Sequence, residues 1–490
     1  MMSRHRRGLT IAGAVVLAVA SVRASELSDD LKARRARLMD ALGPDALIVL
    51  WSAPTRRYST DIDYEYRQDS NLYYLTGLTQ DETMLVLMPG NTSRREILFV
   101  KDRNPAREHW TGPRLTTGDA QDRTGIETVL ATSQFEPFVS AILNRQPFGD
   151  IDEKQATYFF DALAAGRAKV NLLLAQGRGV NDPLTPPLEF ARRIRDRFVG
   201  FQVTDATRVL TDLRLVKTPY ERKILVKSLA ISNEAQMAGM RAARPGAHEY
   251  EVKAAIEAVF RRRGAVSWSY PSIVGSGPNA TILHYPDGER QMQAGDLLLV
   301  DAACNYQYMS GDITRTYPVS GTFSAPHKDI YQIVLQAQEE AIAIARPGAS
   351  LQDVHKKTVD VIKAGLLRLG LITDASGDQY RMWYTHNSSH YIGIDVHDVG
   401  ERTRPLQPGM AFTIEPGIYI RQGALDALPR TPANDALIAR IQPAVKKYAD
   451  IGVRVEDSFL LDDTGLRRLS ASVPRTIEEI ESFMKPRGSK

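Results

Sequence analysis

The chain has 490 residues, of which 43% are hydrophobic and 24% charged, a composition that is typical of globular proteins and excludes disordered and fibrous classes. This length exceeds what one simple core accommodates, so two domains are the default expectation. The formal net charge of +4 falls to zero without residues 1–24, which hold four arginines and no acid, so no basic surface for nucleic acid is expected.

The first predicted element is a signal peptide over residues 1–24. Three arginines precede an apolar run at residues 9–20, which is short for a membrane span, and Val22 and Ala24 fit cleavage before Ser25. An uncleaved anchor is the alternative. We therefore expect an exported, periplasmic protein without a stable membrane span after cleavage. General secretion is favoured, although the paired arginines also permit twin-arginine export.

Residues 25–210 are predicted to form an N-terminal α/β domain. Strand-like apolar runs at Ala46–Trp51, Thr83–Met88 and Glu96–Val100 alternate with helical stretches. The single histidine of this domain, His109, stands in a segment that we interpret as a polar surface loop. The domain therefore offers no histidine cluster for a metal.

Residues 211–490 are predicted to form a second domain that contains a duplicated unit, with the boundary between Thr204 and Thr218. The first copy opens with a helix whose start carries Thr218 as N-cap, a proline in the first turn and a capping-box glutamate. That helix ends near Pro245, and a second helix runs to Gly264.

The later copy repeats this pattern with helices near His327–Ala345 and Ser350–Leu369. RPGAHEYEV from Arg244 aligns with RPGASLQDV from Arg346 without a gap. RPGA alone could be a common helix stop. Matching helices, strands and acids together favour duplication.

Two predicted strands share one design, in which a glycine and a short apolar run lead to a carboxylate. GDLLLVD ends at Asp301 and GMAFTIE ends at Glu415, and each is followed by a further acid, Asp312 or Glu456. A carboxylate at the end of a buried strand is costly unless it is paired or bound to metal. Two related strands of this kind predict a shared cation site.

Three histidines lie close together in HNSSHYIGIDVHDVG, namely His386, His390 and His397. The spacing of the first two is that of a helical zinc motif, but Asn387 stands where that motif needs a glutamate. The segment from Tyr391 is β-branched and glycine-containing, so we interpret it as strand, with a bend needed to bring His397 to the same side.

The candidate metal ligands are four carboxylates and one imidazole: Asp301, Asp312, His390, Glu415 and Glu456. Such a set favours Mn²⁺ over a structural zinc, although Zn²⁺ and Co²⁺ accept the same ligands. Four negative charges call for two divalent ions, bridged by carboxylates and hydroxide at roughly 3.5–4 Å. This arrangement predicts metal-assisted hydrolysis.

Together the motifs LHYPD, LVDAAC, GDITRTYPV, HNSSHYIGIDVHDVG, TIEPGIYI and GVRVED resemble those of the aminopeptidase P family of pita-bread metallopeptidases, with prolidase next. DYEYRQDSNLYYLTGL and REHWTGPRL are similar to the N-terminal domain of that family. The resemblance implies an α/β (α+β) fold, with a creatinase-like N-terminal domain before a duplicated pita-bread catalytic domain.

The resemblance also implies roles for individual residues. One metal would be held by Asp312, His390, Glu415 and Glu456, and the second by Asp301, Asp312 and Glu456. Glu415 would handle the proton during attack on the carbonyl before proline, and His397 would stabilise the tetrahedral oxygen. His284 and His386 would shape the substrate site.

Three further residues are expected near the substrate. Arg454 would orient a ligating carboxylate from the strand that leads to Glu456. Tyr419 would line the pocket for the proline ring, with a core aromatic as the alternative. Trp110 resembles a family tryptophan that can reach the active site of a neighbouring subunit, a role that depends on the oligomeric state. A homo-oligomer, dimer or tetramer, is expected.

The chain departs from the family pattern at Asn387, Ser388 and Tyr391. Asn387 can tolerate a positive φ, which would preserve the local backbone while substrate preference changes. Residues 420–450 form a longer segment than the family requires and would serve as a flap, an oligomer contact or a surface insertion. Cys304, the one cysteine, is expected to be a small core residue.

These observations predict an exported Xaa-Pro aminopeptidase that acts on peptides with proline second. The tertiary amide and fixed φ of proline make the preceding bond a poor fit for general peptidases. Prolidase, which cuts only dipeptides, is the enzyme alternative. A peptide-binding pseudoenzyme is the alternative from a different class.

Overall fold

The computed structural model describes residues 26–149, 153–174 and 179–485. The predicted signal peptide lies outside these residues. Among the helices described, none is long and apolar enough to cross a membrane. The chain divides into two compact units, with the division between Arg214 and Leu215.

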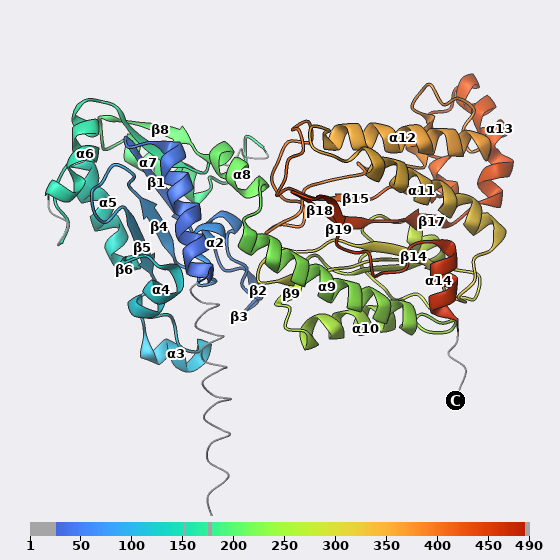
Figure 1. Cartoon of the computed structure of the whole chain (residues 1–490), viewed down its shortest axis with the longest axis horizontal. Helices are drawn as coiled ribbons and strands as arrows, with labels where there is room; N and C mark the ends of the chain where they lie inside the picture. The colour runs from blue at the N-terminus through green and yellow to red at the C-terminus, as the bar shows by residue number, and fades with distance from the viewer. Residues whose placement is uncertain (1–25, 150–152, 175–178, 486–490) are drawn as a thin grey trace, which may run out of the picture. The chain divides into compact units, whose positions relative to one another are not determined.

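The first unit is built on a six-stranded mixed sheet with the order β6-β5-β4-β1-β7-β8 (Figure 1). Only β4 is antiparallel to both of its neighbours. The strands are β1 (Ala46–Trp51), β4 (Met84–Leu87), β5 (Glu96–Val100), β6 (Thr128–Ala131), β7 (Ala168–Leu172) and β8 (Phe201–Asp205), and β2 (Arg57–Ser59) and β3 (Ile62–Asp63) form a separate hairpin. The mixed α/β fold predicted for this part is confirmed.

Helices accompany this sheet, and those at residues 135–143, 153–164 and 186–195 contribute apolar side chains to its core. The helices are one at residues 26–42, α2 (Ser70–Thr76), α3 (Pro105–Thr111), α4 (Thr117–Thr124), α5 (Phe135–Leu143), α6 (Glu153–Ala164), α7 (Pro186–Arg195) and α8 (Thr207–Leu215). The core joins Phe135 and Phe138 of α5 to Phe99 of β5. His109 is exposed as expected, but it lies in α3 rather than in a loop, because Asn104 caps the following turn and Pro105 starts it.

The second unit has two helix pairs with strands between them (Figure 1). The first pair is α9 (Pro219–Ala242) and α10 (Glu249–Arg262), and the second pair is α11 (Ala325–Ile344) and α12 (Leu351–Arg368). The Oγ of Thr218 accepts the N–H of Glu221 at 3.1 Å, and the Glu221 carboxylate accepts the N–H of Thr218 at 2.9 Å. The predicted capping box and the duplicated helix pairs are therefore confirmed.

The strands of this unit form short antiparallel sheets that bring equivalent strand ends together. They are β9 (Ser267–Trp268), β10 (Ile273–Ser276), β11 (Leu297–Asp301), β12 (Cys304–Tyr306), β13 (Met309–Ser310), β14 (Thr314–Pro318), β15 (Ala411–Ile414), β16 (Gly417–Ile420), β17 (Ile451–Arg454), β18 (Asp457–Asp462) and β19 (Gly465–Arg468). The sheet orders are β10-β11-β14, β13-β12-β9, β15-β18-β19 and β16-β17. The halves join where the N–H of Glu456 donates to the Thr314 carbonyl at 3.1 Å.

The expectation of a strand from Tyr391 to Gly400 is wrong. Tyr391 makes one bridge to Phe412, and the chain then folds back, with the N–H of Asp398 donating to the Tyr391 carbonyl at 2.8 Å. The N–H of Ile392 still donates to the Ala411 carbonyl at 3.0 Å, but the N–H of Gly393 donates within the turn, to the Asp395 carbonyl at 3.0 Å, so the pairing with Phe412 does not continue as a ladder.

Two other parts of this unit are regular. Residues 420–450 contain α13 (Pro432–Lys447), which buries Ile441 and Val445 in the main core. The last helix is α14 (Ile477–Met484). Cys304 is free and fully buried, with its Sγ near the hydroxyls of Ser228 and Ser232, as expected of a core residue.

Candidate metal centre and active site

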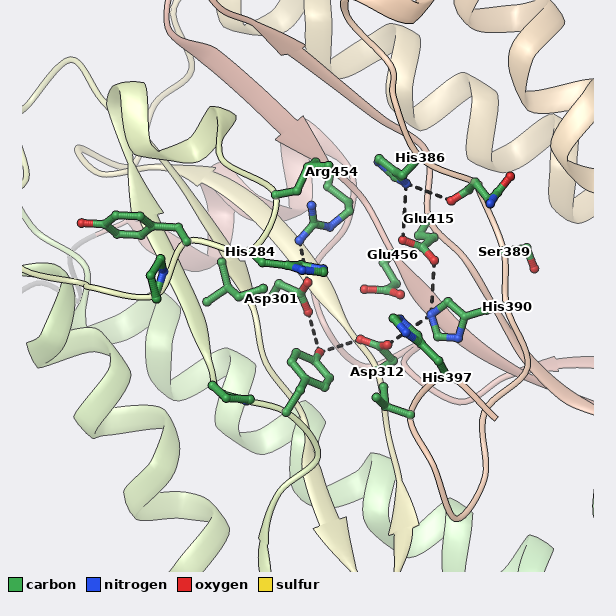
Figure 2. Close-up of a pocket in the computed structure, with 18 of the residues that line it drawn as sticks. His284, Asp301, Asp312, His386, Ser389, His390, His397, Glu415, Arg454 and Glu456 are labelled. Carbon is green, nitrogen blue, oxygen red and sulfur yellow. Dashed lines mark hydrogen bonds and ion pairs between the residues drawn. The ribbon is translucent and has the colours of Figure 1, made fainter. Parts of the chain in front are cut away.

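A cavity of about 660 Å³ opens between the two repeats of the second unit. Its walls carry side chains from β11, the segment before β14, the loop around His390 and the strand ends at Glu415 and Glu456 (Figure 2). All five predicted metal ligands line it: Asp301, Asp312, His390, Glu415 and Glu456. The duplication explains this convergence, because equivalent strands from the two copies end at the same place.

The ligand atoms fall into three groups, within each of which they lie no more than 4.8 Å apart. The groups are Asp301, Asp312 and Glu456; His390, Glu415 and Glu456; and Asp312, His390 and His397. The first two groups share Glu456. Two neighbouring cation positions with a common carboxylate are compatible with this geometry.

The electrostatics of the cluster call for cations. Burial, followed by the charges of Asp312, Glu415 and Asp301, raises the pKa of Glu456 well above its usual range. Burial likewise raises the pKa of the Glu415 carboxyl to about 7. Such carboxylates resist ionisation together unless positive charge compensates them. The donor set, carboxylate oxygens with one imidazole, fits hard divalent ions, so the centre is suited to divalent metal.

Neighbouring hydroxyl groups fix the carboxylates. The phenol oxygen of Tyr270 lies 2.5 Å from a carboxylate oxygen of Asp301 and 2.5 Å from one of Asp312, and it has a single proton to share between them, while Thr314 donates to Glu456 at 2.7 Å. Tyr270 also lines the cavity, although no motif or spacing in the sequence singled it out. Groups of this kind orient ligands and tune the metal that they hold.

Arg454 starts a hydrogen-bonded chain that runs from the metal centre to His386. Its guanidinium donates to Asp301 at 2.5 Å and to the hydroxyl of Tyr419 at 2.9 Å. Tyr419 donates in turn to Nε2 of His386 at 2.8 Å, and Nδ1 of His386 donates to the carbonyl of Asn387 at 2.8 Å. Burial and the charge of Arg454 lower the pKa of His386 to about 3, so this histidine is neutral.

The prediction that Tyr419 lines the pocket is not met. Its side chain is 4% exposed, it packs with Ile273 and Leu299, and it is absent from the cavity wall. Tyr419 lies in β16, opposite Gly452 of β17. Tyr419 therefore contacts His386 and Arg454, which line the cavity, from a buried position in the core.

His397 and His284 reach the cavity from exposed positions (Figure 2). The ring of His397 stands edge-on to the ring of His390, with centroids 4.3 Å apart. Burial and His390 lower the pKa of His397. Trp110 belongs to the first unit, where its side chain is 86% exposed.

The three departures from the family pattern have different surroundings. Asn387 lines the cavity, and it is not among the residues with positive φ. The anticipated left-handed backbone is unnecessary there. Ser388 is buried, with its Oγ 3.2 Å from Nδ1 of His355, and Tyr391 is 1% exposed. Of the three, Asn387 alone can contact a substrate in this cavity.

A buried ion pair holds the loop that carries His397. Lys217 donates to Asp398 at 2.7 Å, and each side chain is 1% exposed. Asp398 follows His397 directly, so the pair fixes the loop beside the start of α9. A buried charge without its partner is strongly unfavourable.

Lys217→Met is therefore expected to lower the free energy of unfolding by about 3–5 kcal/mol. Denaturant unfolding measures this change, with Lys227→Met as the control, because Lys227 is an exposed lysine on α9, the helix that follows Lys217. Unfolding free energies that are equal in the two variants would contradict the role given to the pair.

Comparison with known protein families gives two consecutive matches. The profile described as Metallopeptidase family M24 matches residues 223–463, and that described as Aminopeptidase P, N-terminal domain, matches residues 31–149. The Xaa-Pro aminopeptidase of Escherichia coli K12 is 33% identical over 471 residues, which cover 94% of this chain and 98% of the relative. Human Xaa-Pro aminopeptidase 3 is 30% identical over 454 residues, covering 90% and 81%.

Solved structures agree with this relationship. The aminopeptidase PepP of Pseudomonas aeruginosa superposes with a TM-score of 0.77 at 32% identity, covering 93% of this chain and 98% of the other. Aminopeptidase P from Escherichia coli with the inhibitor Pro-Leu gives a TM-score of 0.77 at 33% identity, with the same coverage. The chain belongs to metallopeptidase family M24 and, within it, to the Xaa-Pro aminopeptidases, with an aminopeptidase P N-terminal domain before a pita-bread domain.

Proposed function

We propose that this chain is an exported aminopeptidase that uses two divalent metal ions to hydrolyse the Xaa-Pro bond at the N-terminus of peptides. The observation that carries this proposal is the buried group of four carboxylates and His390 at the wall of a cavity of about 660 Å³. A cavity of this size accommodates the first few residues of a peptide. The membership of the family supplies the substrate class.

The five predicted ligands would hold the metals as the sequence resemblance implies, with Asp312 and Glu456 shared between them. Bound divalent ions lower the pKa of a coordinated water and polarise a carbonyl group. We favour Mn²⁺, because the donor set is rich in carboxylates, and Zn²⁺ and Co²⁺ are the alternatives.

Side chains of the cavity would then transfer the proton, stabilise the carbonyl oxygen and position the substrate. Water adds to the carbonyl carbon, the carbon–nitrogen bond breaks, and one proton must reach the proline nitrogen. Glu415 would accept the proton of the water and deliver it to that nitrogen. His397 would donate a hydrogen bond to the carbonyl oxygen as it gains charge, and His284 and His386 would bound the substrate site.

His397→Ala is expected to lower kcat by about 10²–10³-fold, because a donor to the developing oxyanion is lost. KM is expected to change much less than kcat. Steady-state kinetics on an Xaa-Pro-Xaa tripeptide measures both, with His248→Ala as a control at a histidine outside the cavity wall. A fall in kcat that is equal in both variants would contradict this role.

The choice between aminopeptidase and prolidase is tested with two substrates. We expect release of the N-terminal residue from an Xaa-Pro-Xaa tripeptide and no release when alanine replaces proline. Cleavage of an Xaa-Pro dipeptide alone would instead identify a prolidase. Binding of both peptides without cleavage by the metal-loaded protein would favour the pseudoenzyme.

Export and assembly are also part of the proposal. The basic, apolar and small-residue pattern of residues 1–24 supports export to a periplasm. Exposed Trp110, which we infer approaches the substrate of a neighbouring subunit, supports a dimer or tetramer. Mass measurement of the mature protein in solution tests both inferences, since it reports cleavage before Ser25 and the number of subunits.

A further inference from the structure

Two buried glutamines occupy the same position in the two repeats of the second unit. Gln236 lies in α9, eight residues before the RPGA stretch at Arg244, and Gln338 lies in α11, eight residues before the RPGA stretch at Arg346. Both side chains are 0% exposed. Glutamine is mostly exposed in proteins, so a fully buried one needs specific partners.

In the first repeat, Gln236 joins the two segments that carry aspartate ligands. Its amide nitrogen donates to the carbonyl of Ala302 at 2.9 Å and to the carbonyl of Ile313 at 2.8 Å. Ala302 follows Asp301, and Ile313 follows Asp312. One side chain thus contacts the backbone directly beside both aspartates.

In the second repeat, Gln338 makes similar contacts, but to the residues before the acidic ligands instead of those after them. Its amide nitrogen donates to the carbonyl of Ile414 at 3.0 Å and to the carbonyl of Val455 at 3.2 Å. Ile414 precedes Glu415, and Val455 precedes Glu456. The duplicated unit therefore provides one buried amide for each pair of acidic ligands.

We propose that Gln236 and Gln338 form a glutamine clamp, in which each side chain is a positioning residue that fixes the separation of one pair of ligating carboxylates. A primary amide has two N–H donors, one for each segment of a pair. Loss of the amide removes one donor from each buried carbonyl, and in the first repeat it leaves the 3.1 Å bond from the Ala302 N–H to the Ile313 carbonyl to join the two segments alone, so their separation is less tightly fixed. This inference rests on the two-metal function proposed above.

The two amides differ in how their oxygens are held. Oε1 of Gln338 accepts a hydrogen bond from Arg475 at 2.9 Å, whereas Oε1 of Gln236 is buried and has no hydrogen-bond partner among the residues that the structure describes. Burying an amide oxygen without a hydrogen bond destabilises the fold. The two bonds that the amide nitrogen of Gln236 donates offset this cost. Gln236 therefore acts mainly through those two bonds.

The ligand sets predict which metal each glutamine affects. Asp301 belongs only to the set of the second metal, and Glu415 belongs only to the set of the first. Gln236→Met is expected to weaken mainly the metal beside Asp301. Gln338→Met is expected to weaken mainly the metal beside Glu415.

Calorimetric titration of Mn²⁺ into metal-stripped full-length protein tests the clamp. Methionine nearly matches glutamine in volume and has no N–H donor. We expect each Met variant to bind one of two Mn²⁺ ions with a Kd about 10–100-fold higher than in the wild type. The matched control is Asn233→Leu, which loses a side-chain bond from α9 to the Leu469 carbonyl at 3.0 Å and is expected to keep the wild-type Kd.

Gln236→Asn and Gln338→Asn retain the amide on a side chain that is one methylene shorter, and we expect Kd values between those of wild type and the Met variants. If the Met variants fail to fold, the Kd values of the Asn variants are compared with those of the wild type instead. Wild-type Kd values for both ions in the Met and Asn variants would overturn the clamp. A wild-type protein that binds no Mn²⁺ would instead overturn the proposed function on which the clamp depends.

Discussion

Replacement of Glu415 with glutamine is expected to lower kcat for Xaa-Pro hydrolysis by about 10²–10⁴-fold. Glu415 lies at the cavity wall, its Oε1 lies 3.3 Å from Nε2 of His390, and Thr413 donates to it at 3.2 Å. Glutamine keeps the size of the side chain and an oxygen for the metal. It removes the group that accepts the proton and delivers it to the leaving nitrogen.

Glu415→Gln is compared with Glu401→Gln, which neutralises an exposed glutamate outside the cavity wall. Steady-state kinetics at saturating Mn²⁺ reports kcat and KM, and metal analysis reports occupancy. The expected pattern is a large fall in kcat with metal still bound. Unchanged turnover in Glu415→Gln would refute the proton-handling role.

Asp312→Asn is expected to have an effect of similar size for a different reason. Asp312 contributes to two of the three ligand groups, and its Oδ2 lies 3.4 Å from Nε2 of His390. The amide of asparagine is neutral, so it holds a divalent cation less strongly than a carboxylate does. Loss of the shared ligand is expected to reduce bound Mn²⁺ from two equivalents to one or none, and kcat by at least about 10²-fold.

Metal analysis after gel filtration, together with kinetics, checks the Asp312 prediction. The control is Asp296→Asn, since Asp296 is an acid of the same repeat that pairs with Arg290 and is not part of the cavity wall. Two equivalents of tightly bound Mn²⁺ in Asp312→Asn would show that the shared ligand lies elsewhere.

The sequence predicts the duplicated framework because local signals and repetition agree. The capping box at Thr218, the paired helices and the two acid-terminated strands each rest on patterns of short range. The same patterns bring Asp301, Asp312, Glu415 and Glu456 to one cavity, because equivalent strands of related halves end together.

Other features depend on contacts between distant segments, and local patterns do not reveal them. The loop after Tyr391 is β-branched, but its shape depends on Asp398 and Lys217, which is far away in the sequence. Tyr419 contacts His386 instead of lining the cavity, because its ring packs with Ile273 and Leu299, which are far away in the sequence. Tyr270 has no recognisable spacing from Asp301 and Asp312.

The glutamine clamp is only partly predictable from the sequence. The equal distance of Gln236 and Gln338 from their RPGA stretches is visible in the sequence. The function of this repetition becomes apparent only when the helices pack against the strand ends and bring each amide to two carbonyls.

The most direct test of the two-metal account is a titration of Mn²⁺ into metal-stripped protein, with bound metal and release of the N-terminal residue from an Xaa-Pro-Xaa tripeptide followed together. The account predicts no release without metal and full activity when two equivalents are bound. Full release by the metal-free protein would contradict the account. So would a protein that binds two equivalents of Mn²⁺ and leaves the tripeptide intact.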